Sequence, residues 1–115
     1  VSPYTNLAIL YSGNNQSEKV KSILIQGILN FPENPSLIYF MGLNEGALGN
    51  EVQQLKYLKQ AYNLAPNNPK YSYNFILMLY KSGRTKEAKN ELANAMKLNP
   101  NNQRLEELRV YFERN

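Results

Sequence analysis

The side chains in this sequence that could do chemistry are mainly glutamate, lysine, tyrosine and asparagine, because Cys, His and Asp are absent. Their absence excludes thiolate nucleophiles, imidazole bases, Cys/His zinc sites, disulfides and the Ser-His-Asp triad. Glu45 and Glu51 could lie near one another, but a carboxylate pair without a third group is ordinary surface. Gly42, Gly46 and Gly49 follow no predicted strand, so they form no phosphate-binding loop. We therefore predict no enzymatic activity, no metal site and no cofactor.

Composition indicates a folded and mildly basic chain. Its 115 residues are 43% hydrophobic and carry a net charge of +4, which suits one domain or a short repeat array. The lysines and arginines are dispersed among nine glutamates, so we interpret the charge as solvated surface. No stretch approaches the roughly 18–20 apolar residues of a membrane span. The chain opens on Val1 rather than Met, which suggests an excised segment of a longer protein. We expect a soluble segment of unknown compartment, cytoplasmic or periplasmic.

The chain repeats itself with a period of 34 residues, as the prolines at 32, 66 and 100 show. Other columns keep the same spacing: Leu24, Leu58 and Leu92; Gly27, Ala61 and Ala95; Leu7, Met41 and Phe75; Asn15, Gly49 and Gly83. Three copies without gaps therefore cover residues 1–34, 35–68 and 69–102.

Each copy is predicted to contain two helices. Asn-Pro pairs at 34–35 and 68–69 are expected to begin the first helices, since Asn caps a helix and Pro suits its first position. Gly49 and Gly83 are expected to end those helices in a left-handed turn. In the third copy we expect Thr85 to cap the second helix.

A last helix is predicted at 103–115. Leu105, Leu108 and Phe112 recur there at spacings of three and four residues. They match the apolar columns of the earlier first helices only if the preceding turn is one residue shorter. We interpret this segment as a capping helix that covers the last repeat, with the first helix of a truncated further repeat as the alternative.

This pattern resembles the tetratricopeptide repeat family over nearly the whole chain. Family positions are matched along the first helix of copy one and the second helix of copy three by Tyr4, Leu7, Ala8, Tyr11, Ala88, Leu92, Ala95 and Pro100. The middle copy departs, with Glu45 in place of Tyr and Gln54 in place of a small residue, so it should be looser or use these polar groups. The resemblance implies an all-α fold, a right-handed α-solenoid of antiparallel helix pairs with about seven helices in a single domain, 1–115.

In similar proteins the first helix of each pair lines a concave groove. Carried over by register, the groove residues are Asn6, Ile9, Tyr39, Phe40, Leu43, Lys70, Tyr73, Asn74, Leu77 and Lys81. Tyrosine offers apolar area and a hydroxyl at low entropic cost, and asparagine both donates and accepts, so such a groove suits a peptide. The alternative is that some of these rings pack between neighbouring first helices.

One better-defined subtype of the family binds chaperone C-termini through a carboxylate clamp of two Lys, two Asn and an Arg. Only Lys70 matches that set here, while Thr5, Ile9, Phe40 and Asn74 replace the other members. We therefore expect no carboxylate clamp and a preference for an apolar or aromatic segment.

The sequence thus predicts a protein–protein interaction scaffold that holds a peptide of an unidentified partner in its groove. The alternative is self-association as a homo-oligomer, through the groove or through Val110 and Tyr111 in the last helix. Binding of single-stranded nucleic acid, with Tyr rings stacking on bases beside Lys70 and Lys81, ranks below both.

Overall fold

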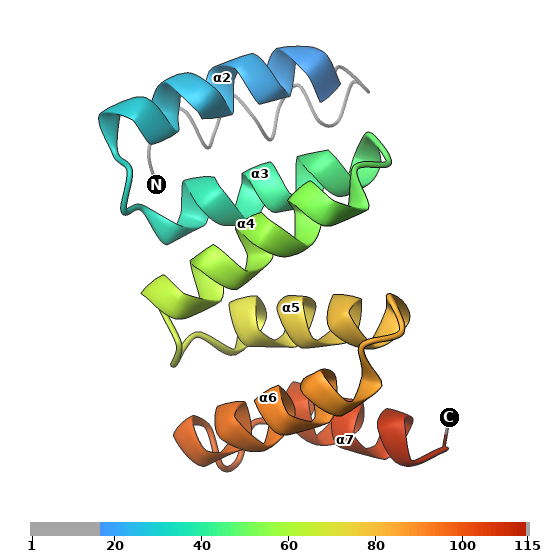
Figure 1. Ribbon diagram of the computed structural model, residues 1–115. Coiled ribbons are helices and arrows are strands. Elements are labelled where there is room, and N and C mark those ends of the chain that lie inside the picture. Colours follow the sequence, from blue (N-terminus) through green and yellow to red (C-terminus); the bar gives the residue numbers. More distant parts are fainter. Residues whose placement is uncertain (1–16, 115) are drawn as a thin grey trace. The chain divides into compact units, whose positions relative to one another are not determined.

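A computed structural model of the chain describes residues 17–114, and within that range it contains six helices and no strand (Figure 1). The helices are α2 (Ser17–Asn30), α3 (Pro35–Ala47), α4 (Glu51–Leu64), α5 (Pro69–Lys81), α6 (Thr85–Leu98) and α7 (Gln103–Arg114). Two predicted groove residues, Asn6 and Ile9, lie outside the described residues. None of these six helices is long and apolar enough to cross a membrane.

The helices begin with the period that the sequence shows. Pro35, Pro69 and Gln103 begin α3, α5 and α7 at intervals of 34 residues, and α2, α4 and α6 begin at the same interval. The turns before α3, α5 and α7 therefore have equal length, so the condition under which the apolar residues of the last helix would match the earlier columns is not met. Instead, α7 starts in register and buries a different stripe, formed by Leu105, Leu108 and Phe112.

Asparagine caps begin α3 and α5, as predicted. The Asn34 side chain accepts hydrogen bonds from the backbone N–H groups of Ser36 and Leu37, at 3.0 and 3.3 Å. Asn68 accepts one from the N–H of Lys70 at 3.0 Å. In both helices a proline takes the first position, where an N–H would have no partner within the helix.

Left-handed glycines follow the same two helices. Gly49 has φ of 82° and Gly83 has φ of 90°, a region that residues with a Cβ rarely adopt. After α5, the N–H of Arg84 donates to the carbonyl of Leu79 at 3.0 Å, and that of Gly83 donates to Tyr80 at 3.1 Å. These two bonds form a Schellman turn, which satisfies carbonyls at the end of the helix.

The start of α6 differs from its prediction by one residue. Thr85 is the first helical residue, and the capping position belongs to Arg84, which makes no side-chain cap bond. The cap assigned to Thr85 is therefore wrong, because the turn through Gly83 already brings Thr85 into the helix. The Arg84 side chain instead donates to Glu87 at 2.9 Å.

The helices form two compact units, and α2, α3 and α4 make up the first. Helix α3 packs against both α2 and α4. A buried cluster and the side chains packed against it consist of Val20, Leu24, Leu37 and Met41 with Ile28, Phe40 and Tyr57. Gly42 allows a close approach of α3 to α4, since an added Cβ there would lie 3.3 Å from the backbone nitrogen of Leu58.

Glu45 is a buried carboxylate in this first unit, with 2% of its side chain exposed. Its Oε1 lies 3.2 Å from Nζ of Lys21 on α2, an ion pair without hydrogen-bond geometry. Its Oε2 accepts a 2.9 Å hydrogen bond from Nδ2 of Asn50. The middle copy therefore uses the polar group that stands where the family has Tyr.

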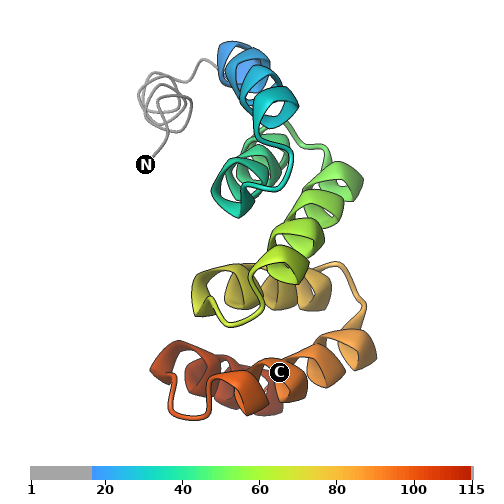
Figure 2. The same ribbon diagram turned by 90° about the vertical axis from the view of Figure 1, so that its left-hand side faces the viewer.

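Helices α5, α6 and α7 form the second unit, in which α7 packs against both of the others (Figure 2). The Tyr80 ring of α5 stacks on Phe112 of α7, with centroids 4.1 Å apart. The other buried apolar side chains include Phe75, Ile76, Leu79, Ala88, Leu92, Ala95, Leu105 and Leu108. The apolar stripe predicted for the last helix, Leu105, Leu108 and Phe112, is therefore confirmed as buried.

Candidate functional site

Three predicted groove residues of α5 line one pocket. Tyr73, Leu77 and Lys81 are spaced by four residues, so they follow one another along a single face of the helix. The pocket that they border has a volume of about 310 Å³. The register carried over from the repeat therefore brings these three side chains together.

The opposite wall of this pocket comes from α7. It consists of Glu107, Leu108 and Tyr111, and we call the whole pocket, with Tyr73, Leu77 and Lys81 on the other side, the α5–α7 groove. The sequence did not lead us to assign these residues to the groove, although Leu108 was expected in the apolar stripe and Tyr111 was a candidate for self-association. The signal for them was nevertheless present, because they lie one repeat length after Tyr73, Asn74 and Leu77.

An aromatic contact supports Tyr111 from outside the groove. Its ring meets Tyr80 edge-on, with the centroids 5.8 Å apart, and Tyr80 stacks in turn on Phe112. Such pairs add to the stability gained from buried area alone. Tyr111 is still exposed enough to present its ring to the groove. It is therefore a supported part of the groove wall.

Cations border the groove at several points. The Arg104 guanidinium lies 4.5 Å from the centre of the Tyr73 ring, within the range of a cation–π contact. Lys81 is exposed at one side of the pocket. Glu107 supplies a carboxylate, which accepts a 3.3 Å hydrogen bond from Gln103. The groove thus combines apolar and aromatic walls with a rim that carries more positive than negative charge.

The other predicted residues of the third copy lie on α5 outside the pocket lining. Lys70 is exposed in the first turn of the helix. The amide of Asn74 donates to the carbonyl of Lys70 at 2.8 Å, so that donor is used within the helix.

The predicted residues of the second copy lie on α3, in the first unit. Tyr39 is only 4% exposed, so its ring belongs to the core. Of the two interpretations of the rings, packing applies to Tyr39, since a peptide would reach it only after rearrangement of its neighbours. Phe40 is partly buried and meets Tyr39 edge-on at 5.7 Å. Leu43 is exposed.

No protein-family model matches the sequence, and comparison with curated proteins finds no match. Solved structures do match its fold. The second TPR domain of human RPAP3, in complex with the HSP70 peptide SGPTIEEVD, is similar with a TM-score of 0.80 and 15% identity. That match covers 96% of this chain and 92% of the RPAP3 domain.

Two further solved structures with a similar fold are a secretion chaperone and a transferase. The Yersinia enterocolitica type III secretion chaperone SycD, in complex with a peptide of the translocator YopD, is similar with a TM-score of 0.78 and 15% identity, over 96% of this chain and 84% of SycD. The Thermobaculum terrenum O-GlcNAc transferase is similar with a TM-score of 0.72 and 22% identity; the match covers 89% of this chain but 20% of the transferase. At these identities the likenesses show the fold.

Proposed function

We propose that this chain, which has the tetratricopeptide repeat fold, is a protein-interaction scaffold that binds a peptide segment of a partner in the α5–α7 groove. One observation carries the proposal: the groove residues Tyr73, Leu77 and Lys81 line one pocket together with three side chains of α7. Two similar structures, RPAP3 and SycD, hold peptides, which supports a peptide as the class of ligand.

The composition of the groove indicates the kind of peptide. Apolar walls around about 310 Å³ suit one large apolar or aromatic side chain of the ligand. Tyr73 and Tyr111 offer rings of the type that dominates binding energy at interfaces. Lys81 and Arg104 favour an acidic residue beside that anchor, and Arg104 is positioned by its contact with Tyr73. We therefore propose an aromatic or apolar anchor next to a carboxylate, without a chaperone-type clamp.

Binding without catalysis is the activity that these residues suit. Lys81 and Glu107, the charged side chains of the pocket lining, are both exposed. General acids and bases are usually tuned by burial or by close charged neighbours. An exposed lysine and an exposed glutamate are better suited to contacts with a ligand.

The proposal is tested by selecting peptides from a random display library on the whole chain. The affinity of the selected peptide is then measured by fluorescence anisotropy. Tyr73→Ala should weaken binding by roughly 1–2 kcal/mol, about 5- to 30-fold, if the ring is an anchor. Leu77→Glu should abolish binding, because it puts a charge into the apolar wall.

Leu29→Glu is the matched control for Leu77→Glu. Leu29 is 76% exposed on α2, in the other unit, so the same substitution there should leave both fold and affinity unchanged. Circular dichroism verifies the helical content of each variant. Equal peptide affinity in the two folded variants would refute the assignment of the α5–α7 groove.

A further inference from the structure

A second pocket lies between α6 and α7, apart from the α5–α7 groove. It has a volume of about 300 Å³, and we call it the α6–α7 cleft. Its lining consists of Lys89, Leu92, Ala93 and Met96 of α6 with Arg109, Phe112 and Glu113 of α7. The apolar side chains are thus bordered by three charged ones.

The first unit shows what covers the same positions there. Two repeat lengths earlier, the residues that correspond to Leu92, Met96 and Arg109 are Leu24, Ile28 and Met41. Leu24 and Met41 belong to the buried cluster of α2 and α3, and Ile28 packs against it. Tyr57 of α4 also packs against that cluster. In the first unit, these positions therefore form part of the surface on which a helix packs.

A charged pair is repeated at the same register. Lys21 and Glu45, which form an ion pair of 3.2 Å in the first unit, correspond to Lys89 and Glu113 in the cleft. Lys89 and Glu113 form no such ion pair, because Arg109, which stands at the position of Met41, pairs with Glu113 instead.

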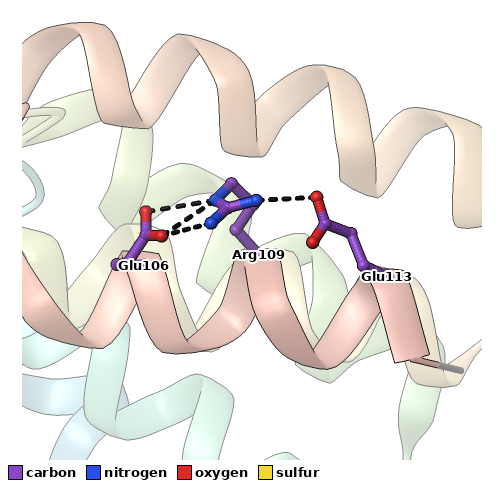
Figure 3. Close-up of polar contacts among 3 residues, drawn as sticks. All are labelled: Glu106, Arg109 and Glu113. Carbon is purple, nitrogen blue, oxygen red and sulfur yellow. Dashed lines mark hydrogen bonds and ion pairs between the residues drawn. The ribbon is translucent and has the colours of Figure 1, made fainter.

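Figure 3 shows that Arg109 bonds to Glu106 on one side and to Glu113 on the other, the second contact being 2.6 Å. Glu113 is therefore already engaged by a neighbour on its own helix. Among residues 17–114, no carboxylate pairs with Lys89, although its counterpart Lys21 has one. The cleft thus presents an exposed cation, Lys89, that makes no ion pair with residues 17–114, beside apolar side chains.

We propose that the α6–α7 cleft is a second docking surface, which holds an acidic amphipathic helix of a partner protein. The helix would place its apolar side on Ala93 and Met96, the accessible apolar residues of the lining, and a carboxylate beside Lys89. A helix is chosen because the equivalent surface of the first unit packs against one. An acidic helix is chosen because Lys89 lacks a carboxylate, whereas Glu106 and Glu113 are held by Arg109.

The test uses two designed helical peptides with the same leucine stripe, one flanked by glutamates and the other by lysines. Each is titrated by fluorescence anisotropy against the whole 115-residue chain. The glutamate peptide should bind saturably, and the lysine peptide should bind at least about tenfold more weakly. Lys89→Glu should weaken binding of the glutamate peptide by about tenfold.

Three more variants locate the binding site. Ala93→Glu, at an exposed residue of the cleft, should abolish binding of the glutamate peptide. Lys59→Glu makes the charge change of Lys89→Glu at an exposed position of α4 and should leave the affinity unchanged. Val52→Glu, at a residue of α4 that is 80% exposed and lines neither pocket, should also leave it unchanged.

Several results would overturn the inference. One is the absence of saturable binding by either peptide, and another is equal affinity for both peptides. A third is binding of the glutamate peptide that neither Lys89→Glu nor Ala93→Glu weakens, provided that both variants keep their helical content. Sedimentation over a concentration series supplies a further result. A dimer that Ala93→Glu dissociates would assign the cleft to a second copy of this chain instead.

Discussion

The ion pair between Lys21 and Glu45 predicts unequal effects for the removal of its two members. Lys21→Met leaves the Glu45 carboxylate, 2% exposed, with Asn50 as its remaining polar partner. Glu45→Leu removes the buried charge and introduces the residue that the next copy has at the same position, Leu79. The freed Lys21 can then turn to water, because 36% of its side chain is already exposed.

The contacts set the size of each effect. Breaking a fully buried pair by removal of one partner costs about 3–5 kcal/mol. Here the exposure of Lys21 screens the pair, and the Asn50 hydrogen bond still satisfies one carboxylate oxygen. We therefore expect Lys21→Met to lower the free energy of unfolding by about 1–3 kcal/mol. Glu45→Leu should stay within about 1 kcal/mol of the wild type or exceed it, since apolar replacements of buried charges are often neutral or stabilising.

Urea unfolding, followed by circular dichroism at neutral pH, measures these free energies. Lys59→Met is the control, because it makes the same substitution at an exposed lysine of α4. The double variant Lys21→Met/Glu45→Leu should recover most of the stability that Lys21→Met loses. The reasoning is refuted if Lys21→Met is no less stable than Glu45→Leu, or if the double variant is as unstable as Lys21→Met.

Three further predictions concern the second unit. Gly83→Ala should lower the free energy of unfolding by about 1–2 kcal/mol in the same urea assay, because the residue has φ of 90°. Tyr80→Ala should lower the melting temperature by several degrees and also weaken peptide binding, because Tyr80 stacks on Phe112 and supports Tyr111 from outside the groove. The hydrogen bond from Arg109 lowers the pKa of Glu106, so its contribution to stability is fully present above the ordinary glutamate pKa of about 4.3 and is lost as the pH falls through the lowered value. The difference in melting temperature between wild type and Arg109→Gln should accordingly be largest at neutral pH and vanish in acid; a difference that persists in acid would contradict this account.

The ends of the helices were the most predictable features. Asn34 and Asn68 cap α3 and α5, and Gly49 and Gly83 adopt positive φ after them, as expected. These signals depend on a few neighbouring residues, so the sequence contains all that they need. The start of α6 was predicted one residue too late. Thr85 was expected to be the cap, whereas the Schellman turn through Gly83 places Arg84 at the cap and makes Thr85 the first helical residue.

The candidate site was only partly predictable, because burial depends on neighbouring helices. The burial of Tyr39 could not be predicted, because the sequence does not distinguish a ring that lines a groove from one that a neighbouring element covers. Glu107 and Tyr111 were missed for another reason. The groove register was carried over to the three copies only, whereas the backbone of the last helix continues the period of 34 residues and brings Glu107 and Tyr111 to the groove positions.

Helix α7 buries a different stripe from α5 because charged residues occupy the positions that α5 buries. These charges also limit how tightly the α6–α7 cleft can bind a helix. One repeat length after the buried residues Ser72, Phe75 and Leu79 of α5, helix α7 carries Glu106, Arg109 and Glu113 (Figure 3). Arg109 forms ion pairs with both glutamates at the surface, an arrangement that supports the proposal of a capping helix.

A docked helix that covered Arg109 completely would have to remove water from both of its ion pairs, which opposes binding. Good complementarity would therefore place the helix over Ala93 and Met96, with the α7 charges left at the hydrated edge of the interface. The affinity for such a helix should then be in the micromolar range, weaker than the affinity between permanently associated subunits. Only the apolar lining and the contact with Lys89 contribute fully to it. A nanomolar complex whose affinity did not change in Arg109→Leu would contradict this limit, since that variant removes the charge that keeps the edge hydrated.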